Sequence, residues 1–267
     1  MFNNKVVIIT GSTQGIGLKT AELLAQRGAL LIINSRRPEK VQTALAYLKQ
    51  YTQHVAGLAG DVSDIAFCEE LREFAVQQFG RIDILINNAG IAAGGIMMES
   101  RAEAFKKVID INLLGCVYPT LACLPELCKQ QGAVLFIGSV AGIAGLPSYS
   151  AYAASKRALS SLAESLRSEL LDAGVFVGIH YPGFTENESD KTIMNARGEF
   201  EVLKKREGVK AMSREQTALN IIKQLEHKKF RMFSSVSAWA VYTSYRLFPN
   251  LFVWLLGRYR KKIMSMQ

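Results

Sequence analysis

Residues 5–17 read KVVIITGSTQGIG and combine three signals in one short stretch. The β-branched run KVVIIT predicts a buried strand, and the apolar pattern that follows the stretch predicts a helix. Between them, Gly11 permits a tight turn, Gly15 allows close approach to a pyrophosphate, and Gly17 allows the helix to pack against the strand. A glycine-rich turn in this context predicts a nucleotide site at the helix N-terminus. The alternative is a plain strand–helix turn.

Further strands are predicted where apolar runs end in polar or glycine-containing turns. They lie at 29–34, 54–64, 81–90, 133–138, 175–183 and 229–234. Helical patterns separate them, including one at 105–129 and an Ala-rich helix from about Tyr149 that Gly174 would end. Ser213 is a candidate N-cap for the helix that precedes the last strand.

Ser35, Arg36 and Arg37 follow the strand at 29–34, and no acidic residue stands there. In dinucleotide sites an acidic residue at this place binds the adenosine ribose of NAD, whereas an arginine accommodates the 2′-phosphate of NADP. The three residues therefore predict NADP(H). The alternative is that the arginines are solvated loop charges.

Ser139 follows the apolar run AVLFIG, and the sequence then reaches Tyr152 and Lys156. On a helix, residues four apart share one face, so the phenol and the ammonium can reach one ligand. An ammonium favours the ionised form of a nearby phenol, and such a pair can pass a proton to or from an alkoxide. The pattern Tyr-x-x-x-Lys also arises by chance, as a ring at the edge of a core beside a solvated lysine.

The composition indicates a globular chain without a metal site. At 267 residues, 49% hydrophobic and 21% charged, it is long enough for one α/β domain with a large core. The four cysteines lack disulfide or zinc spacing, and the three histidines are scattered. A strand is predicted almost at the first residue, which leaves no room for a signal peptide. The sequence therefore predicts a reducing, cytoplasmic setting.

Three further turns complete an ordered set of motifs. The third predicted strand ends at Asp61-Val62, the fourth at Asn87-Asn88-Ala89-Gly90, and a later one at Pro182-Gly183. In this order the chain resembles the short-chain dehydrogenase/reductase family from Lys5 to about Phe233. The resemblance implies a single Rossmann-type, doubly wound α/β domain with a parallel sheet of about seven strands. We expect this catalytic domain to span residues 1–235.

The resemblance also implies roles for individual residues. Tyr152 would donate or accept the proton, Ser139 would position the carbonyl, and Lys156 would lower the pKa of the tyrosine and bind the nicotinamide ribose. Asn112 would hold a water in a proton relay, which completes the catalytic set. The expected cofactor contacts are Thr10, Gly11, Ser12, Gln14, Gly15, Ile16, Gly17, Ser35, Arg36, Arg37, Asp61, Val62, Asn88, Ala89, Gly90, Tyr152, Lys156, Pro182, Gly183 and Thr185. In this family, helices near 113–130 and 152–173 often form a dimer interface, so a homodimer or homotetramer is expected.

Asn112 lies inside the predicted helix 105–129, where asparagine is a poor helix former. A functional role or a local kink would explain its presence, and a satisfied structural asparagine is the alternative.

Residues 186–212 are polar and longer than an ordinary connection, which predicts an irregular loop. The resemblance implies that this loop is the substrate lid, mobile until a ligand binds. Asn187 stands where the family often has a threonine.

The C-terminal segment 236–267 differs in charge from the rest of the chain. No acidic residue follows Glu226, whereas eight Lys or Arg follow His227. Its longest clean apolar piece, LFVWLLG, is too short to span a bilayer, which needs about 20 residues. An apolar face with tryptophan and flanking basic residues predicts an amphipathic helix in the membrane interface. The alternative is a segment packed on its own domain or on a dimer partner, and nucleic acid is a poorer account because no basic stripe runs through the fold.

Local matches narrow the resemblance to the 3-ketodihydrosphingosine reductase branch. They are residues 112–119, residues 182–187 and the basic, hydrophobic C-terminal segment. The expected activity is NADPH-dependent reduction of a hydrophobic ketone, with 3-ketodihydrosphingosine as the leading hypothesis, by an enzyme peripheral to the cytoplasmic face of a membrane. The alternatives are a 3-oxoacyl or steroid/retinoid reductase of the same family and, from another class, a membrane-associated NADP(H) sensor or scaffold without turnover.

Overall fold

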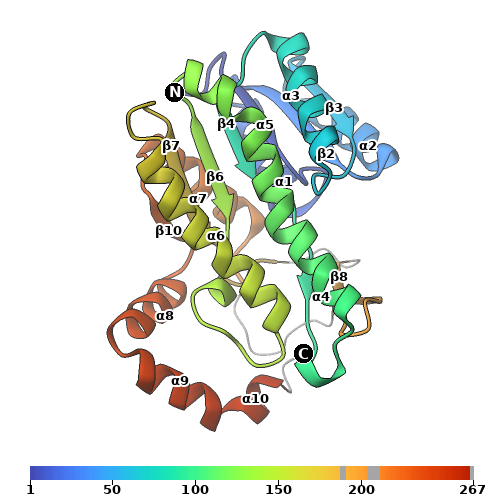
Figure 1. Cartoon of the computed structure of the whole chain (residues 1–267). Helices are drawn as coiled ribbons and strands as arrows, with labels where there is room; N and C mark the ends of the chain where they lie inside the picture. The colour runs from blue at the N-terminus through green and yellow to red at the C-terminus, as the bar shows by residue number, and fades with distance from the viewer. Residues whose placement is uncertain (187–190, 204–210, 265–267) are drawn as a thin grey trace.

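The predicted strands form one parallel sheet of seven strands, in the order β10-β7-β6-β4-β1-β2-β3 (Figure 1). The structure, a computed structural model, describes residues 1–186, 191–203 and 211–264. The strands are β1 (Val6–Ile9), β2 (Leu30–Ser35), β3 (Val55–Ala59), β4 (Ile84–Asn87), β6 (Ala133–Ile137), β7 (Phe176–Tyr181) and β10 (Arg231–Phe233). Their parallel pairing confirms the Rossmann-type prediction.

Helices cover both faces of this sheet (Figure 1). One face packs against α1 (Gly15–Ala25), α2 (Pro38–Leu48) and α7 (Arg214–Glu226), and the other against α3 (Ile65–Phe79), α5 (Gly115–Lys129) and α6 (Ser150–Glu169). Successive residues of β1 enter opposite cores, with Ile9 in the first and Ile8 in the second. Burial on both faces explains why the strands read as continuous apolar runs, and the doubly wound prediction is confirmed.

The helix predicted at 105–129 is longer than expected and contains a π turn. It comprises α4 (Ala102–Ile109), the π turn η2 (Asp110–Leu114) and α5. Asn112 lies in the π turn, so the local irregularity expected there is present. Among the described residues this is the one helical stretch that is long and apolar enough to cross a membrane, but half of its apolar window is buried inside the fold.

The prediction of an irregular loop over 186–212 is wrong for the part that the structure describes. β8 (Thr192–Met194) and β9 (Phe200–Val202) form an antiparallel hairpin, and β8 pairs with β5 (Ala92–Ala93) in a second sheet. The side chain of Asn195 accepts two backbone N–H hydrogen bonds in the turn, and Gly198 has a φ of 89°. The polar, glycine-containing turn therefore closes the hairpin. Asn187 and the rest of the expected lid lie outside the described residues.

Several element ends differ from the predictions. The third strand was expected to end at Asp61-Val62 but ends at Ala59, and Asp64 then caps α3 by accepting the backbone N–H of Ala66 at 3.0 Å. The helix expected to end at Gly174 already ends at Glu169. The predicted cap of α7 is confirmed, since Ser213 Oγ accepts the backbone N–H of Gln216 at 3.1 Å.

The C-terminal segment forms three helices beyond the carboxyl edge of the sheet: α8 (Val236–Leu247), α9 (Pro249–Arg258) and α10 (Arg260–Met264) (Figure 1). Helix α8 packs on the body of the protein, with the ring centroids of Tyr242 and Phe233 5.0 Å apart and the Arg157 guanidinium 5.1 Å from the Tyr245 ring. The alternative prediction, that the C-terminal segment packs on its own domain, is therefore confirmed for α8. Beyond it, α9 leaves large apolar side chains exposed, including Leu251 and Trp254. The division at residue 235 stays a prediction.

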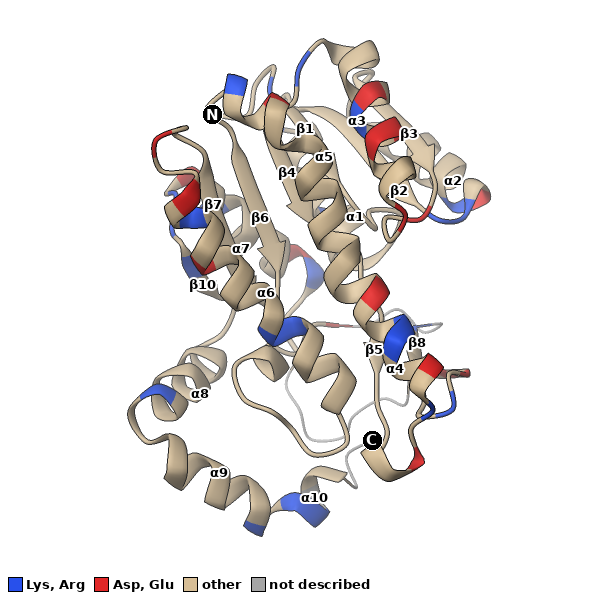
Figure 2. Ribbon diagram, viewed as in Figure 1, with Lys and Arg blue, Asp and Glu red and all other residues tan. Residues whose placement is uncertain are grey.

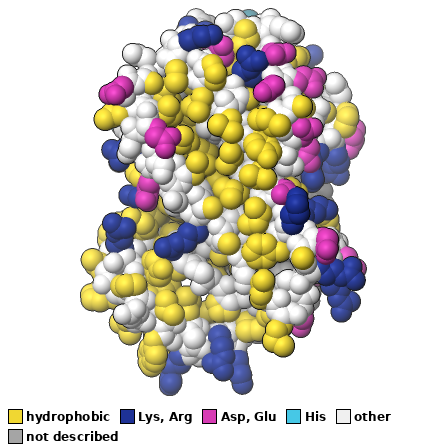
Figure 3. All heavy atoms as spheres, in the orientation of Figure 1, with side chains coloured by type: hydrophobic (Ala, Val, Ile, Leu, Met, Phe, Trp, Pro, Cys, Tyr) yellow, Lys and Arg dark blue, Asp and Glu magenta, His cyan; other side chains and the backbone are white. Residues whose placement is uncertain are grey.

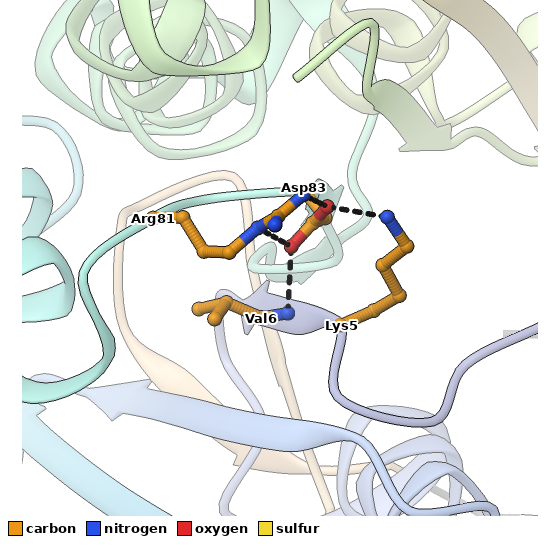
Figure 4. Close-up of polar contacts among 4 residues, drawn as sticks. All are labelled: Lys5, Val6, Arg81 and Asp83. Carbon is orange, nitrogen blue, oxygen red and sulfur yellow. Dashed lines mark hydrogen bonds and ion pairs between the residues drawn. The ribbon is translucent and has the colours of Figure 1, made fainter. Parts of the chain in front are cut away.

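The amino edge of the sheet holds a buried carboxylate (Figure 4). Asp83, just before β4, is 3% exposed and accepts hydrogen bonds from Lys5 Nζ at 2.9 Å, the Val6 backbone N–H at 3.0 Å and the Arg81 guanidinium at 2.6 and 2.8 Å. Burial opposes ionisation of this carboxyl, but the hydrogen bonds from Arg81 and Lys5 hold its pKa below the ordinary value of 3.8. Asp83 therefore ties the start of β1 to the start of β4.

The four cysteines are free thiols. Cys68, Cys116 and Cys123 are fully buried, and burial raises the pKa of Cys68 and Cys123 to about 12 and that of Cys116 to about 11. Cys128 of α5 is only partly buried.

Candidate active site

The glycine-rich turn and the turn after β4 bind one another at the carboxyl edge of the sheet. Thr10 Oγ1 accepts the backbone N–H groups of Asn88 and Ala89, both at 3.0 Å. In return Asn88 Nδ2 donates to the carbonyls of Thr10 and Gly11, both at 2.9 Å. The amide of Asn88 therefore holds the shape of the turn, and two motifs far apart in the sequence form one surface.

The three glycines of the turn do different things. Gly11 has a φ of 61°, and an added Cβ would lie 2.7 Å from Ala89 Cα. A Cβ at Gly17 would lie 2.4 Å from Asn88 Nδ2. This glycine was predicted to make room for the strand, but it makes room for the turn after β4. At Gly15, with a φ of 59°, no atom lies within 4 Å of an added Cβ. The N-terminus of α1 is thus open where a pyrophosphate would bind, and the site fits a dinucleotide.

The other residues of the turn divide by burial. Ser12 is fully buried, and its Oγ donates to the Ile9 carbonyl at 2.6 Å and accepts the Asn34 N–H at 3.1 Å. This side chain therefore holds β1 and β2 together, and the geometry does not offer it to a cofactor. Ile16 is half-buried against the core, whereas Gln14 is exposed.

A cationic group lies at the end of β2. Arg36 is 48% exposed at its side chain and lies 3.8 Å from Asp61, and the backbone N–H of Arg37 reaches Ser35 Oγ at 3.5 Å. Lys40 of α2 donates to Gln14 Oε1 at 3.4 Å and so brings another positive charge to the turn. Lys40 was not among the cofactor contacts predicted from the sequence, although it follows Arg36 by four positions. Val62 is buried against Gly115 and is a packing residue.

Asn112 and Lys156 meet beside Gly90. A Cβ added at Gly90 would lie 3.0 Å from Asn112 Oδ1 and 3.4 Å from Lys156 Nζ. Asn112 accepts the backbone N–H of Ile91 at 2.8 Å and donates to its carbonyl at 3.0 Å, and Lys156 Nζ donates to the Ile137 carbonyl at 3.0 Å. Both side chains are buried, so the turn after β4, the π turn and α6 converge on one point.

Ser139 follows β6 and begins the short helix η3 (Val140–Gly142). Its Oγ accepts the backbone N–H of Ala141 at 3.2 Å. A Cβ added at Gly142 would lie 2.7 Å from the Lys156 carbonyl, so η3 packs directly on α6. Ser139 and Lys156 are thereby fixed to adjoining segments.

Tyr152 lies one turn before Lys156 on α6 and is half-buried. It lines a small cavity of about 20 Å³ together with Gly95, beyond β5, and Met194 of β8. The second sheet therefore forms the wall opposite Tyr152. This wall was not predicted, because residues 186–212 were expected to be an irregular loop.

The segment after β7 closes the edge. Pro182 and Gly183 are half-buried, and Thr185 Oγ1 lies 3.3 Å from the Gly183 carbonyl and 3.2 Å from Thr217 Oγ1. A Cβ at Gly183 would lie 2.8 Å from Ser235 Oγ, so this segment abuts the start of α8.

His180 lies at the same edge and is fully buried. Its ring nitrogens contact Gln224 Oε1 at 2.8 Å and Ser234 Oγ at 2.7 Å. Burial lowers the pKa of His180 to about 4, so the ring is neutral at pH 7. Since both partners are uncharged, His180 joins β7 to α7 and to Ser234, the residue after β10, without adding charge to the site.

Comparison with known proteins agrees with this geometry. Residues 5–198 match the family model described as short chain dehydrogenase. The chain is 40% identical over 187 residues, 69% of its length, to 11-beta-hydroxysteroid dehydrogenase-like 4A of Arabidopsis thaliana, and this match spans 62% of that relative. It is 33% identical over 193 residues, 72% of its length and 78% of the relative, to the 3-oxoacyl-(acyl-carrier-protein) reductase of Escherichia coli.

A solved structure agrees with the fold. The short chain dehydrogenase/reductase of Burkholderia phymatum in complex with NAD superposes with a TM-score of 0.81 at 24% identity, over 94% of this chain and 95% of that one. The match of residues 5–198 to the family model shows that the chain belongs to the short-chain dehydrogenase/reductase family.

Proposed function

We propose that the protein reduces a hydrophobic ketone with NADPH, using Tyr152 as the proton donor. The observation that carries this proposal is the convergence of Asn112 and Lys156 at Gly90, next to the open turn at Gly15 and one helical turn from Tyr152. One edge of the sheet thus offers a place for a dinucleotide beside a phenol and an ammonium.

In this proposal each residue has one task. A bound nicotinamide cofactor supplies the hydride. Tyr152 gives its hydroxyl proton to the carbonyl oxygen, and the Ser139 hydroxyl holds that oxygen in place. Lys156 holds the cofactor ribose and places a positive charge near the phenol. Asn112 keeps the turn at Ile91 in position, and a water held beside it would continue the proton path.

The preference for NADP(H) rests on the end of β2. Arg36 and Arg37 stand there, and Lys40 lies next to Gln14 of the glycine-rich turn. A guanidinium can bind a 2′-phosphate with two parallel hydrogen bonds. Asp61 lies 3.8 Å from Arg36 and Glu39 lies 3.8 Å from Arg37, distances that leave room for an incoming phosphate to compete.

Contact with an anionic membrane is supported by the outer face of α9. Leu251, Trp254 and Leu255 are 53%, 59% and 38% exposed on it. Figure 2 shows basic residues and no acidic ones on α8–α10, and Arg258 and Arg260 follow this apolar face directly. Apolar burial together with basic residues is the combination that binds interfacial helices to anionic lipid.

This contact is tested by sedimentation with phosphatidylserine vesicles. Trp254→Glu should bind them several-fold more weakly than the unsubstituted chain, because a charge would replace a ring that enters the interface. Leu171→Glu is the matched control, since Leu171 is 74% exposed but lies beyond α6, at the amino edge of the sheet. If both variants lost vesicle binding equally, or if Trp254→Glu bound vesicles as well as the unsubstituted chain, a specific contact through α9 would be contradicted.

The oligomeric proposal concerns the face formed by α5 and α6. Figure 3 shows hydrophobic side chains gathered over these helices, and Leu121 of α5 is 55% exposed there. We propose a homodimer through this face, as the family resemblance implies. Leu121→Arg should lower the molar mass measured by light scattering if the proposal is correct, and an unchanged mass would contradict it.

The substrate class is a hydrophobic ketone. The names of the two relatives point to steroid and 3-oxoacyl ketones, and the apolar exposure of α9 favours a lipid-like substrate, of which 3-ketodihydrosphingosine is one candidate. The deciding experiment measures NADPH consumption with 3-ketodihydrosphingosine, a steroid ketone, a 3-oxoacyl thioester and a short ketone, each repeated with NADH. Turnover of an apolar ketone with NADPH supports the proposal. Turnover of the short ketone alone would show that the proposed hydrophobic substrate is wrong. Cofactor binding without any turnover favours a sensor or scaffold.

A further inference from the structure

Helix α9 borders an open cavity of about 640 Å³ on the body of the protein. On the body side its walls are the loop 145–147 and one face of the first two turns of α6. On the other side they are Val253, Leu256 and Gly257 of α9. Cavities of roughly 300–1,000 Å³ hold small ligands in proteins, so this one is large enough for a ligand of that size.

The walls of this cavity are mainly apolar. Leu146, Pro147, Val253 and Leu256 face it from both sides. Among the described residues of the wall, Arg157 is the one that carries a charge. Its guanidinium donates to the Ile143 carbonyl and lies over the Tyr245 ring. Because that charge is already paired with groups of the protein, the cavity suits an uncharged, apolar ligand.

The cavity adjoins the place of the proposed reaction. Ser150 lines both this cavity and the smaller one that contains Tyr152. The first turn of α6 is therefore the shared wall between the two spaces. A ligand whose polar end lies at Tyr152 and whose apolar end passes Ser150 would enter the larger cavity.

The opposite wall of the cavity is the helix that carries the exposed apolar face. Leu251, Trp254 and Leu255 are exposed on α9. Val253, itself 58% exposed, and Leu256 line the open cavity. Figure 1 shows α9 lying alongside the loop that leads into α6. An apolar ligand that leaves a bilayer at α9 would thus reach the cavity without crossing the charged surface of the domain. Helix α9 also lies outside residues 5–198, which match the family model, so this wall is a feature of the chain's own C-terminal segment.

We propose that this cavity binds the alkyl chain of a long-chain substrate while its carbonyl group lies at Tyr152. The assignment rests on the proposed function for the position of the carbonyl, but the binding of an alkyl chain in the cavity does not require turnover. It deepens that function by naming the class of ketone, one with a long, flexible and uncharged apolar chain.

Two glycines on opposite walls make the proposal testable. At Gly145 and at Gly257 no atom lies within 4 Å of an added Cβ, and neither has a positive φ. Gly145→Phe and Gly257→Phe should therefore fill the cavity without a backbone clash. Gly145→Ala and Gly257→Ala are the matched controls, because they remove the same glycine and add little volume.

The measurement is the fluorescence titration of the full chain, without vesicles, with a pyrene-labelled long-chain alcohol. Each Phe variant should bind this probe at least tenfold more weakly than its Ala partner, with NADPH binding unchanged as the check on folding. Binding of the probe by both Phe variants with the affinity of the Ala variants would overturn the proposal. Failure of every ketone to turn over would instead remove the proposed function and leave this binding result standing, so the two failures are distinguishable.

Discussion

The two edges of the central sheet use buried polar side chains in opposite ways. At the amino edge, Asp83 accepts hydrogen bonds from two cations and a backbone N–H of the same chain and forms a closed network (Figure 4). At the carboxyl edge, Asn112 and Lys156 also bind backbone groups, but they do so beside the glycine-rich turn, which is open at Gly15. A buried charge is therefore not by itself a sign of function. The closed network stabilises the fold, and the open one offers a surface to a ligand.

The largest effect is expected at the carboxyl edge. Tyr152→Phe should lower kcat by about 10²–10⁴-fold, the usual contribution of a positioned proton donor. NADPH affinity and the free energy of unfolding should stay close to those of the unsubstituted chain, because only one hydroxyl is lost. Steady-state kinetics measures kcat, fluorescence titration measures NADPH affinity, and chemical denaturation measures the free energy of unfolding. Tyr51→Phe, which removes a phenol at the end of α2, is the control, and retained turnover in Tyr152→Phe would refute the proton-donor role.

The pH dependence of stability should separate the two edges. The pKa of His180 is lowered from 6.5 to about 4 in the folded protein, so the unfolded chain binds more protons between these values. The free energy of unfolding should therefore fall as pH drops from 6.5 to 4, by up to about 3 kcal/mol. The contribution of Asp83, whose pKa is lowered, is present above pH 3.8 and is lost only at lower pH.

Urea unfolding at a series of pH values tests this separation. His180→Asn should flatten the slope between pH 6.5 and 4 and leave the slope below pH 3.8 unchanged. An unaltered slope in the upper window would mean that another group titrates there.

The amino edge should respond in stability and not in turnover. Asp83→Asn should lower the free energy of unfolding by about 2 kcal/mol, because the Lys5 and Arg81 hydrogen bonds lose their charged acceptor. Chemical denaturation measures this loss. The kcat per folded molecule should be unchanged, and a large drop in kcat would break the comparison between the edges.

The smallest effect concerns the choice of cofactor. Arg36→Ala should raise KM for NADPH about tenfold and leave KM for NADH nearly unchanged, since one charge-assisted hydrogen bond to the 2′-phosphate is lost. Arg72→Ala, at a partly exposed arginine of α3 that pairs with Glu73, controls for the loss of a surface charge. Equal changes in both KM values would show that Arg36 does not distinguish the cofactors.

The fold was predictable because its signals are local and repeated. The central strands β1, β4 and β6 are buried on both faces and read as apolar runs, and the turns after β1 and β4 carry distinctive glycines and amides. The hairpin at β8 and β9 was missed because these strands are only three residues long and its outer strand is fully exposed. Short exposed strands have no clear period, so a polar segment of this kind resembles a loop.

The sequence predicted which residues lie at the candidate site better than it predicted what each of them does there. Tyr152 and Lys156 share a helix, and their relation follows from helical spacing. Which side chains are already paired depends on contacts across the sheet, such as those of Ser12 with β1 and β2. The cavity beneath α9 could not be predicted, because it arises where the C-terminal segment meets α6 in space.

The most direct test measures deuterium transfer from labelled NADPH to the carbonyl carbon of an apolar ketone, for Tyr152→Phe beside Asp83→Asn. We expect Asp83→Asn to label the product at the rate of the unsubstituted chain per folded molecule, and Tyr152→Phe to do so at least a hundredfold more slowly. Product without deuterium, or equal rates in the two variants, would contradict the assignment of the chemistry to the carboxyl edge.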